Sequence, residues 1–478
     1  MKIGIIKEFK TPSDKRVVFT PSKCVAAKKL FPKIEFLIQS SDVRCYSDKE
    51  YSDLGFSVVD DISSADVLIG VKEVPINKLI SNKKYFFFSH TIKKQPYSKD
   101  LLLSILDKNI ELYDHETIVD RNSNRLIGFG YYAGVVGAYN GFRALGLKNK
   151  IFILPKASDL LDRNQLNNEL LKILIPNIKI VLTGNGRVGS GAKEILDFLK
   201  IKQVSVSEYL NNSFNEPVYV QIDVLDYNER IDKRDLDRFD FYKNPTEYKS
   251  TFNDFSHVSD MFIAGHYYDK NAPKLITLED AISDNFKIKL VADISCDING
   301  PIVSTIRSST IKDPIFGFSP ILNAEVDYMN TDAIAVMAVD NLPCELPRDA
   351  SESFGEMFIK HVLPSLTRVS IKSESIFEGS AIACVPSTPT GKSIILGSGK
   401  LSGRYPIEFR ILASNSDASL PGKRSRFISL KIIRFSVGCQ NANLKLAGSS
   451  MLFEICLFFI FFSDIIVFEE LLILSSSD

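Results

Sequence analysis

The sequence predicts an α/β fold of two Rossmann-like, doubly wound domains with an active-site cleft between them. Three observations predict it: short apolar runs alternate with helical stretches, a glycine-rich turn follows one of these runs, and the chain is too long for one ordinary domain. At 478 residues, two domains are the natural number. An apolar content of 45% is sufficient to fill two cores.

The glycine-rich turn is the most specific of these signals. The run 178–182 predicts a buried strand, and the apolar periodicity over 192–199 predicts a helix. Between them the chain has the spacing G-x-G-x-x-G. In that spacing one glycine forms a tight turn, a second lets the backbone approach a pyrophosphate, and the third lets the helix pack on the strand. The free N–H groups of the helix also favour an anion. We therefore predict a dinucleotide site at Gly184, Asn185, Gly186, Arg187, Val188 and Gly189.

A downstream carboxylate is expected to bind the adenosine ribose. A second short strand is predicted over 203–207, and Glu208 follows it at the distance where a carboxylate accepts hydrogen bonds from ribose hydroxyls. No Arg or Lys directly follows Glu208 to bind a 2′-phosphate, which favours NAD as the cofactor and leaves NADP open. A solvated loop glutamate is the alternative interpretation.

The first 130 residues predict a mainly parallel sheet, because apolar runs alternate with helical segments such as 23–30. The runs are 3–6, 34–38, 66–72 and 85–89. Helical spacing over 129–145 predicts a connector to the second unit. Its further strands are expected near 204–207, 261–265 and 290–294, with a polar, partly irregular insertion at 210–260.

Polar side chains follow several predicted strands of the first unit. Lys72 and Glu73 end one run, and His90 ends the next. In an open α/β sheet, ligands bind beyond the carboxyl ends of the strands, so a substrate is expected to reach both Lys72 and His90. Taken singly, each residue has an ordinary explanation: a solvated loop pair, or a hydrogen-bonded core histidine.

The overall composition excludes several classes of function. The 58 basic and 58 acidic residues cancel, so neither a nucleic acid nor a membrane surface is expected as a partner. The cysteines lack C-x-x-C pairs and the histidines lack ligand spacing, which predicts reduced thiols and no metal. The N-terminus is too short in apolar residues for a signal peptide and predicts a first strand, hence a cytoplasmic protein.

Several longer strings resemble the saccharopine-metabolising amino-acid dehydrogenases: lysine-forming saccharopine dehydrogenase and the lysine–2-oxoglutarate reductase part of the bifunctional enzyme. The wider group includes alanine dehydrogenase and the transhydrogenase α subunit. The resemblance runs from residue 1 to about 380. It is carried by Lys7-Glu8, Arg16-Val17-Val18-Phe19-Thr20-Pro21, Gly70-Val71-Lys72-Glu73, the strings 87–95, 129–134 and 292–297, and 339–348.

This resemblance implies an NAD(P)-dependent interconversion of saccharopine with lysine plus 2-oxoglutarate, which are small-molecule amino-acid and 2-oxo-acid partners. By position, Lys72 takes the proton of the secondary amine, and His90 is the acid–base group for water addition. Arg16, Lys93 and Arg125 are expected to bind carboxylates, with Glu73 and Glu116 as acidic neighbours of Lys72. The later strings add Asp293, Asp340, Asn341 and Leu342 to the cofactor site.

Elementary electrostatics agrees with a basic role for Lys72. A free lysine has a pKa near ~10.4, which is too high for a base at neutral pH. Burial, Arg16 and Lys93 are expected to lower the pKa of Lys72, and Glu73 and Glu116 to raise it. Two rivals stay open: an alanine dehydrogenase acting on pyruvate and ammonia, and an inactive relative that only binds nucleotide. Lys93 and Arg125 favour the larger substrate, since pyruvate has one carboxylate. A homo-oligomer also stays open.

The expected domains are a discontinuous substrate domain, 1–130 plus 345–380, and a dinucleotide-binding domain, 131–344. After about residue 383 the composition changes, and 381–478 is expected to be an atypical tail, disordered or non-native; a reading-frame error is one hypothesis. Its apolar run 455–462 is well short of the ~20 residues that span a bilayer.

Overall fold

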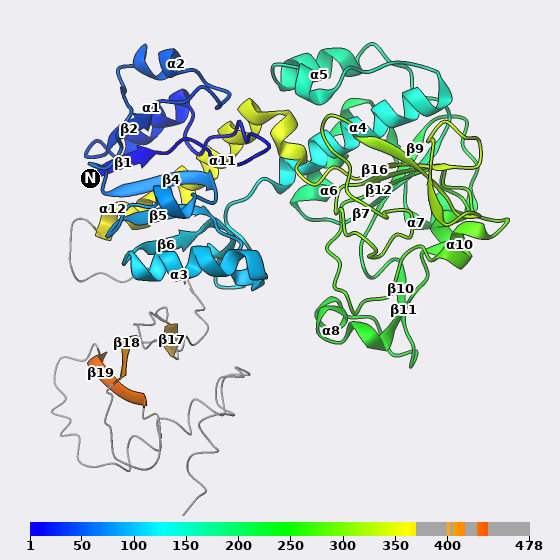
Figure 1. Cartoon of the computed structure of the whole chain (residues 1–478). Coiled ribbons are helices and arrows are strands. Elements are labelled where there is room, and N and C mark those ends of the chain that lie inside the picture. Colours follow the sequence, from blue (N-terminus) through cyan, green and yellow to red (C-terminus); the bar gives the residue numbers. More distant parts are fainter. Residues whose placement is uncertain (370–398, 402–404, 416–427, 438–478) are drawn as a thin grey trace, which may run out of the picture.

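The computed structural model describes residues 1–369 and three later strands, at 399–401, 405–415 and 428–437. Figure 1 shows two separate sheets, each flanked by helices, with the helix α11 (Pro347–His361) returning to the first of them. The predicted class, two Rossmann-like α/β units, is confirmed by the strand order of both sheets.

The first sheet has six parallel strands in the order β3-β2-β1-β4-β5-β6, which is a doubly wound order. The predicted strands are present within a residue or two of their expected ends. Its strands are β1 (Lys2–Ile5), β2 (Glu35–Gln39), β3 (Ser57–Val59), β4 (Val67–Lys72), β5 (Lys84–Phe88) and β6 (Glu111–Asp114). The helices around it are α1 (Pro21–Leu30), α2 (Asp48–Ser52), α3 (Lys99–Asp107) and α12 (Leu363–Val369).

The core of the first unit includes side chains from the end of the described chain. Phe354 and Phe358 of α11 are fully buried with Phe19 and Phe86, and the rings of Phe19 and Phe358 lie 5.4 Å apart. Burying aromatic rings of this size is a large part of what stabilises such a core. This packing supports the assignment of 345–380 to the first domain, although the domain boundaries stay a prediction.

The second sheet has eight strands in the order β15-β14-β16-β13-β12-β7-β9-β8. They are β7 (Lys179–Thr183), β8 (Lys202–Gln203), β9 (Val218–Ile222), β12 (Met261–Ala264), β13 (Leu290–Asp293), β14 (Ile315–Ser319), β15 (Ala324–Val326) and β16 (Ile334–Met337). Only β14 and β15 run antiparallel. The long helix α4 (Gly130–Asn149) packs closely on α6 (Arg187–Phe198), because Gly134 brings the two backbones together: a Cβ there would lie 1.9 Å from the carbonyl oxygen of Val188.

One strand prediction in this unit is wrong. Of the expected strand 203–207, only the edge strand β8 exists, and Ser205 caps a helix, α7 (Val206–Asn211). The strand beside β7 is instead β9, which lies inside the stretch expected to be a polar insertion. Its alternating Val218, Val220 and Ile222 are buried and explain why it forms a core strand.

The real insertion follows β9. It contains β10 (Asn228–Arg230), α8 (Arg238–Lys243), β11 (Tyr248–Ser250) and α9 (Asn253–Ser256), and β10 pairs with β11 in an antiparallel ribbon. Two short helices, α5 (Arg163–Leu170) and α10 (Leu278–Ile282), complete the second unit. In the later strands, β17 (Gly399–Leu401) and β19 (Ile428–Val437) flank β18 (Tyr405–Asn415). The rest of the predicted tail lies outside the described residues, and within the described residues no helix is long and apolar enough to cross a membrane.

Candidate active site

A cavity of about 530 Å³ is lined by residues of both units. The first unit contributes residues that follow its strands, and the second contributes Gly130, at the start of α4, and Arg187, from the glycine-rich turn. The lining residues are Arg16, Lys72, Phe88, His90, Lys93, Glu116, Asn124, Arg125, Ile127, Gly128, Phe129, Gly130 and Arg187. The structure therefore brings together all the predicted catalytic and substrate-binding residues except Glu73, whose carboxylate lies beside His90.

The parallel sheet explains this convergence. Lys72 is the last residue of β4, His90 comes two residues after β5, and Glu116 comes two residues after β6. Neighbouring parallel strands end at the same edge of the sheet, so side chains far apart in the sequence meet there.

Lys72 is fixed in place by a buried carboxylate that sequence reasoning did not assign to the site. Glu8 accepts hydrogen bonds from the backbone N–H groups of Val71, at 2.6 Å, and Lys72, at 2.9 Å. Burial raises the pKa of Glu8 to about 8. Its interaction is with the backbone, so Glu8 positions the end of β4.

The pKa of the Lys72 ammonium is lowered, as predicted, but by different neighbours. Burial is the largest cause, followed by the charges of Arg16 and Lys10, whereas Asp14 and Glu73 raise the pKa of Lys72. Lys10 and Asp14 thus take the places that were expected for Lys93 and Glu116. The lowered pKa increases the fraction of neutral amine, which is the form that can accept a proton.

His90 lies in a left-handed backbone conformation, with φ of +56°. Burial lowers its pKa, as do the charges of Lys72 and Lys93, while Glu73 and Glu116 raise it. The nearer carboxylate is that of Glu73, whose Oε2 lies 3.8 Å from Nδ1 of His90. A histidine with a lowered pKa is neutral near pH 7 and can accept a proton there.

Arg16 is buried and links the two units. Its Nε and Nη2 donate to the two carboxylate oxygens of Asp14, at 3.0 and 2.6 Å, and Nη2 also donates to Oδ1 of Asn341 at 3.2 Å. The guanidinium carbon lies 4.2 Å from the centre of the Phe129 ring. Burial alone would raise the pKa of Asp14, but Arg16 lowers it below its usual range. Only the short spacing from Asp14 to Arg16 hints at this pair, and such a spacing is common on protein surfaces.

The cavity also holds acceptors without a partner. Glu116 receives a hydrogen bond from Nη2 of Arg125 at 2.6 Å and lies 3.8 Å from the ammonium of Lys93, both through Oε1. Within the described part of the chain, Oε2 of Glu116 and Oε2 of Glu73 are buried and have no hydrogen-bond partner. A ligand that brings N–H groups would satisfy them, whereas the surrounding cations suit carboxylates. This combination fits an amino acid.

The glycine-rich turn has the geometry that a dinucleotide needs. Gly184 adopts φ of +95°, and a Cβ on Gly189 would lie 1.8 Å from the carbonyl oxygen of Gly184. A Cβ on Gly186, at the start of α6, meets nothing within 4 Å. The first two positions hold the turn and the helix together, and the third leaves open space where a phosphate can approach the backbone.

The carboxylate beside this turn belongs to Asp223, which sequence reasoning missed. Glu208 is exposed, and its carboxylate caps α7 by accepting from Ser205 N at 2.9 Å. Asp223 directly follows β9, and its Oδ2 accepts from Nδ2 of Asn185 at 3.1 Å. The assignment of the ribose carboxylate to Glu208 is therefore corrected to Asp223. The signal was available in the alternating pattern that ends at Asp223, but the neighbouring polar residues hid it.

The other predicted cofactor residues lie in varied settings. Val188 packs against α4, and Arg187 faces the cavity, where its Nη2 donates to the backbone oxygen of Arg125. Asp340 is exposed, and Leu342 is buried in the core. Asp293 is fully buried, accepts from Oγ1 of Thr305 at 2.7 Å, and has its pKa raised by burial to about 6. Contact of these residues with a cofactor stays a prediction.

Comparison with known proteins bears on this geometry. Residues 4–136 match the family model of the alanine dehydrogenase/PNT N-terminal domain. The first unit belongs to this family. The resemblance to saccharopine dehydrogenases is also confirmed: the chain is 31% identical over 390 residues to alpha-aminoadipic semialdehyde synthase, mitochondrial, of Rattus norvegicus, covering 73% of this chain and 42% of that protein.

Two further relatives show the same kinship. The chain is 28% identical to alpha-aminoadipic semialdehyde synthase of Arabidopsis thaliana, covering 77% of this chain and 39% of that protein. It is 25% identical to saccharopine dehydrogenase [NAD(+), L-lysine-forming] of Yarrowia lipolytica, covering 75% of this chain and 89% of that protein. The chain thus spans about two fifths of the length of the synthases that it matches. It is related to oxidoreductases.

Solved structures agree on the fold. An L-alanine dehydrogenase matches with a TM-score of 0.52 at 16% identity, covering 78% of this chain and 90% of that one. A transhydrogenase from Sinorhizobium meliloti matches with a TM-score of 0.50 at 14% identity, covering 77% of this chain and 94% of that one. At such identities the likeness shows the two-domain fold alone. The cytoplasmic location and the oligomeric state stay predictions.

Proposed function

We propose that the chain is an NAD(P)-dependent oxidoreductase that interconverts saccharopine with lysine plus 2-oxoglutarate. The observation that carries this proposal is the composition of the cavity: Lys72 and His90 share it with several cations and two unpaired carboxylate oxygens. The substrate has both carboxylates and a secondary amine, so it needs both kinds of partner. The lysine-forming saccharopine dehydrogenase among the relatives supports the same substrate.

The cofactor would lie along the glycine-rich turn. Its pyrophosphate is held by the backbone at Gly186 and the start of α6, and its adenosine ribose by Asp223. A bound nicotinamide dinucleotide supplies the acceptor or donor of hydride in this class of reaction. The side chain of Arg187 reaches from the turn into the cavity, so the two ligands are close to each other.

The residues of the first unit bind the substrate and move protons. Arg16 has its Nε and Nη2 engaged by Asp14, so Nη1 is the nitrogen through which it reaches a carboxylate. Lys93 and Arg125 hold the further carboxylates. Neutral Lys72 accepts the proton of the secondary amine, and neutral His90 accepts a proton from the water that adds to the resulting substrate imine. Breaking the carbon–nitrogen bond then releases lysine and 2-oxoglutarate.

The test is a substrate panel with purified protein. Absorbance at the nicotinamide band follows NADH and NADPH with lysine plus 2-oxoglutarate, and separately with pyruvate plus ammonia. We expect turnover with the first pair. Turnover only with pyruvate and ammonia would show an alanine dehydrogenase instead. Cofactor binding without any turnover would show an inactive relative.

A further inference from the structure

The insertion that follows Asp223 forms a compact hairpin beside the adenosine end of the proposed cofactor site. Figure 1 shows β10, β11 and α8 grouped at one end of the second unit, away from the first sheet. Nothing in the mechanism above uses these elements. Their position next to Asp223 nevertheless calls for an explanation, since an insertion placed there can contact whatever binds Asp223.

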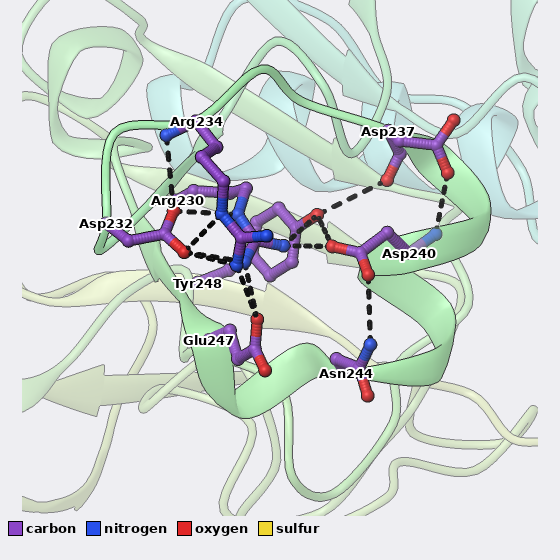
Figure 2. A network of polar contacts seen from close by, with 8 residues as sticks. All are labelled: Arg230, Asp232, Arg234, Asp237, Asp240, Asn244, Glu247 and Tyr248. Atoms are coloured by element: carbon purple, nitrogen blue, oxygen red, sulfur yellow. Dashed lines mark hydrogen bonds and ion pairs between the residues drawn. The ribbon is translucent and has the colours of Figure 1, made fainter.

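The hairpin is locked by a single buried arginine. Arg230, at the end of β10, donates to both oxygens of Asp232 at 2.8 Å and to Glu247 at 2.5 Å, and it also pairs with Asp240 of α8. Tyr248 of β11 donates to the same Asp240 at 2.6 Å. Figure 2 shows these side chains converging on Arg230. The network ties α8 to the ribbon through Asp240.

This tie determines where the other side of α8 points. Residues two apart in a helix lie on nearly opposite sides, since each residue turns by about 100°. With Asp240 directed at Arg230, Arg238 is directed away from that cluster. Its guanidinium pairs with the carboxylate of Asp223, the same carboxylate that accepts from Asn185.

The pair of Asp223 and Arg238 carries both charges that distinguish nicotinamide dinucleotides. A carboxylate at this place binds the ribose 2′-hydroxyl and repels a 2′-phosphate, whereas an arginine nearby accommodates the phosphate. Arg238 neutralises Asp223 and remains half exposed, with 51% of its side chain accessible, so part of its guanidinium is free to receive an anion. Tyr242, one helical turn further on the same side of α8, and Tyr267 are also exposed, with rings 6.4 Å apart.

We propose that Arg238, held by the insertion, selects the dinucleotide that carries a 2′-phosphate, so that the chain prefers NADPH to NADH. This inference rests on the proposed function, because it takes the glycine-rich turn as the cofactor site. The sequence pattern alone favoured NAD, since the arginine is fifteen positions from Asp223 and reaches it only through the folded hairpin.

Equilibrium binding tests the proposal without any turnover. NADH and NADPH, which differ only by the 2′-phosphate, are each titrated into the full chain and followed by nicotinamide fluorescence. The variant Arg238→Gln removes the charge, and Lys243→Gln is the matched control, because Lys243 is an exposed cation at the other end of α8. We expect Arg238→Gln to weaken NADPH binding by about tenfold or more and to leave NADH binding within a few-fold, since a charge-assisted hydrogen bond is lost.

The outcomes separate this inference from the function beneath it. An unchanged ratio of NADPH to NADH affinity in Arg238→Gln overturns the selective role of Arg238, even though both nucleotides bind. Equal loss in Lys243→Gln also overturns it, because the effect would then be one of general charge. Absence of binding by either nucleotide to the unmodified chain overturns the cofactor site itself, and with it the proposed function.

Discussion

Asn185 of the glycine-rich turn donates a hydrogen bond of 3.1 Å to Asp223 at the end of β9. This contact joins the two parts of the proposed cofactor site, the turn for the pyrophosphate and the carboxylate for the ribose. It exists because β9, and not β8, lies beside β7. The side chains that a cofactor would meet therefore depend on strand order.

The first prediction concerns that carboxylate. Replacing Asp223 with Ala should weaken the binding of NADH by about tenfold, because the acceptor for the ribose hydroxyls is lost. Glu208→Ala is the control and should leave NADH affinity unchanged, since Glu208 caps α7 and is exposed. Fluorescence titration measures both. A loss in Glu208→Ala with none in Asp223→Ala would restore the original assignment.

The second prediction separates two glycines of the turn. Gly189→Ala should destabilise the fold by about 1–3 kcal/mol or more, because its Cβ would overlap the backbone oxygen of Gly184. Gly186→Ala should keep the melting temperature near that of the parent, because its Cβ meets nothing, yet it should weaken nucleotide binding where a phosphate approaches. Thermal unfolding and titration of both variants check this. Equal melting temperatures for the two would contradict the packing described here.

The third prediction concerns a buried histidine that has no role in the proposed reaction. His115 is fully buried, its Nε2 lies 2.9 Å from the carbonyl oxygen of Gly70, and burial lowers its pKa to about 4. The unfolded chain takes up a proton near pH 6.5, whereas the folded chain resists it. His115 therefore contributes stability above pH 6.5 that is lost as the pH falls towards 4, by up to about 3 kcal/mol.

Urea unfolding of the parent and of His115→Gln at pH 7, 6 and 5 measures this contribution. The parent should lose more free energy of unfolding on acidification than the variant does. The comparison is needed because Glu8, whose pKa is raised, has the opposite sign: its folded form favours the proton, so its contribution falls as the pH rises from about 4.5 to 8. Parallel pH profiles for the two proteins would contradict the burial of an uncharged His115.

The fourth prediction concerns recognition of the second carboxylate of 2-oxoglutarate. Arg125→Gln should raise the KM for 2-oxoglutarate by about tenfold, because a charged donor to a carboxylate is removed from the cavity. Arg121→Gln, in the same loop and also exposed, is the control and should leave that KM unchanged. Initial rates at saturating lysine measure it. An equal effect of the two substitutions would exclude a specific contact.

The sequence was sufficient for the fold class, the first sheet and most of the cavity. Strand ends carry the functional side chains, so locating β4 and β5 was enough to bring Lys72 and His90 together. The missed residues share a different feature. Asp223 depends on which strand inserts beside β7, and Glu8 and Asp14 act through backbone and side-chain bonds that form only in the folded core.

The link between Asp223 and Arg238 could not be predicted for the same reason. It requires a hairpin whose shape is set by the contacts of Arg230 with carboxylates on three different segments. No local pattern indicates such a cluster. Charge spacing in this stretch resembles an ordinary solvated loop.

The most direct test of the central claim is the turnover of Lys72→Met with lysine, 2-oxoglutarate and reduced nicotinamide dinucleotide, measured beside its nucleotide affinity. The side chain keeps nearly the same length but cannot accept a proton. We predict a fall in kcat of about 10²–10⁴-fold with nucleotide binding unchanged. Full turnover in Lys72→Met would contradict the assignment of Lys72 as the proton acceptor.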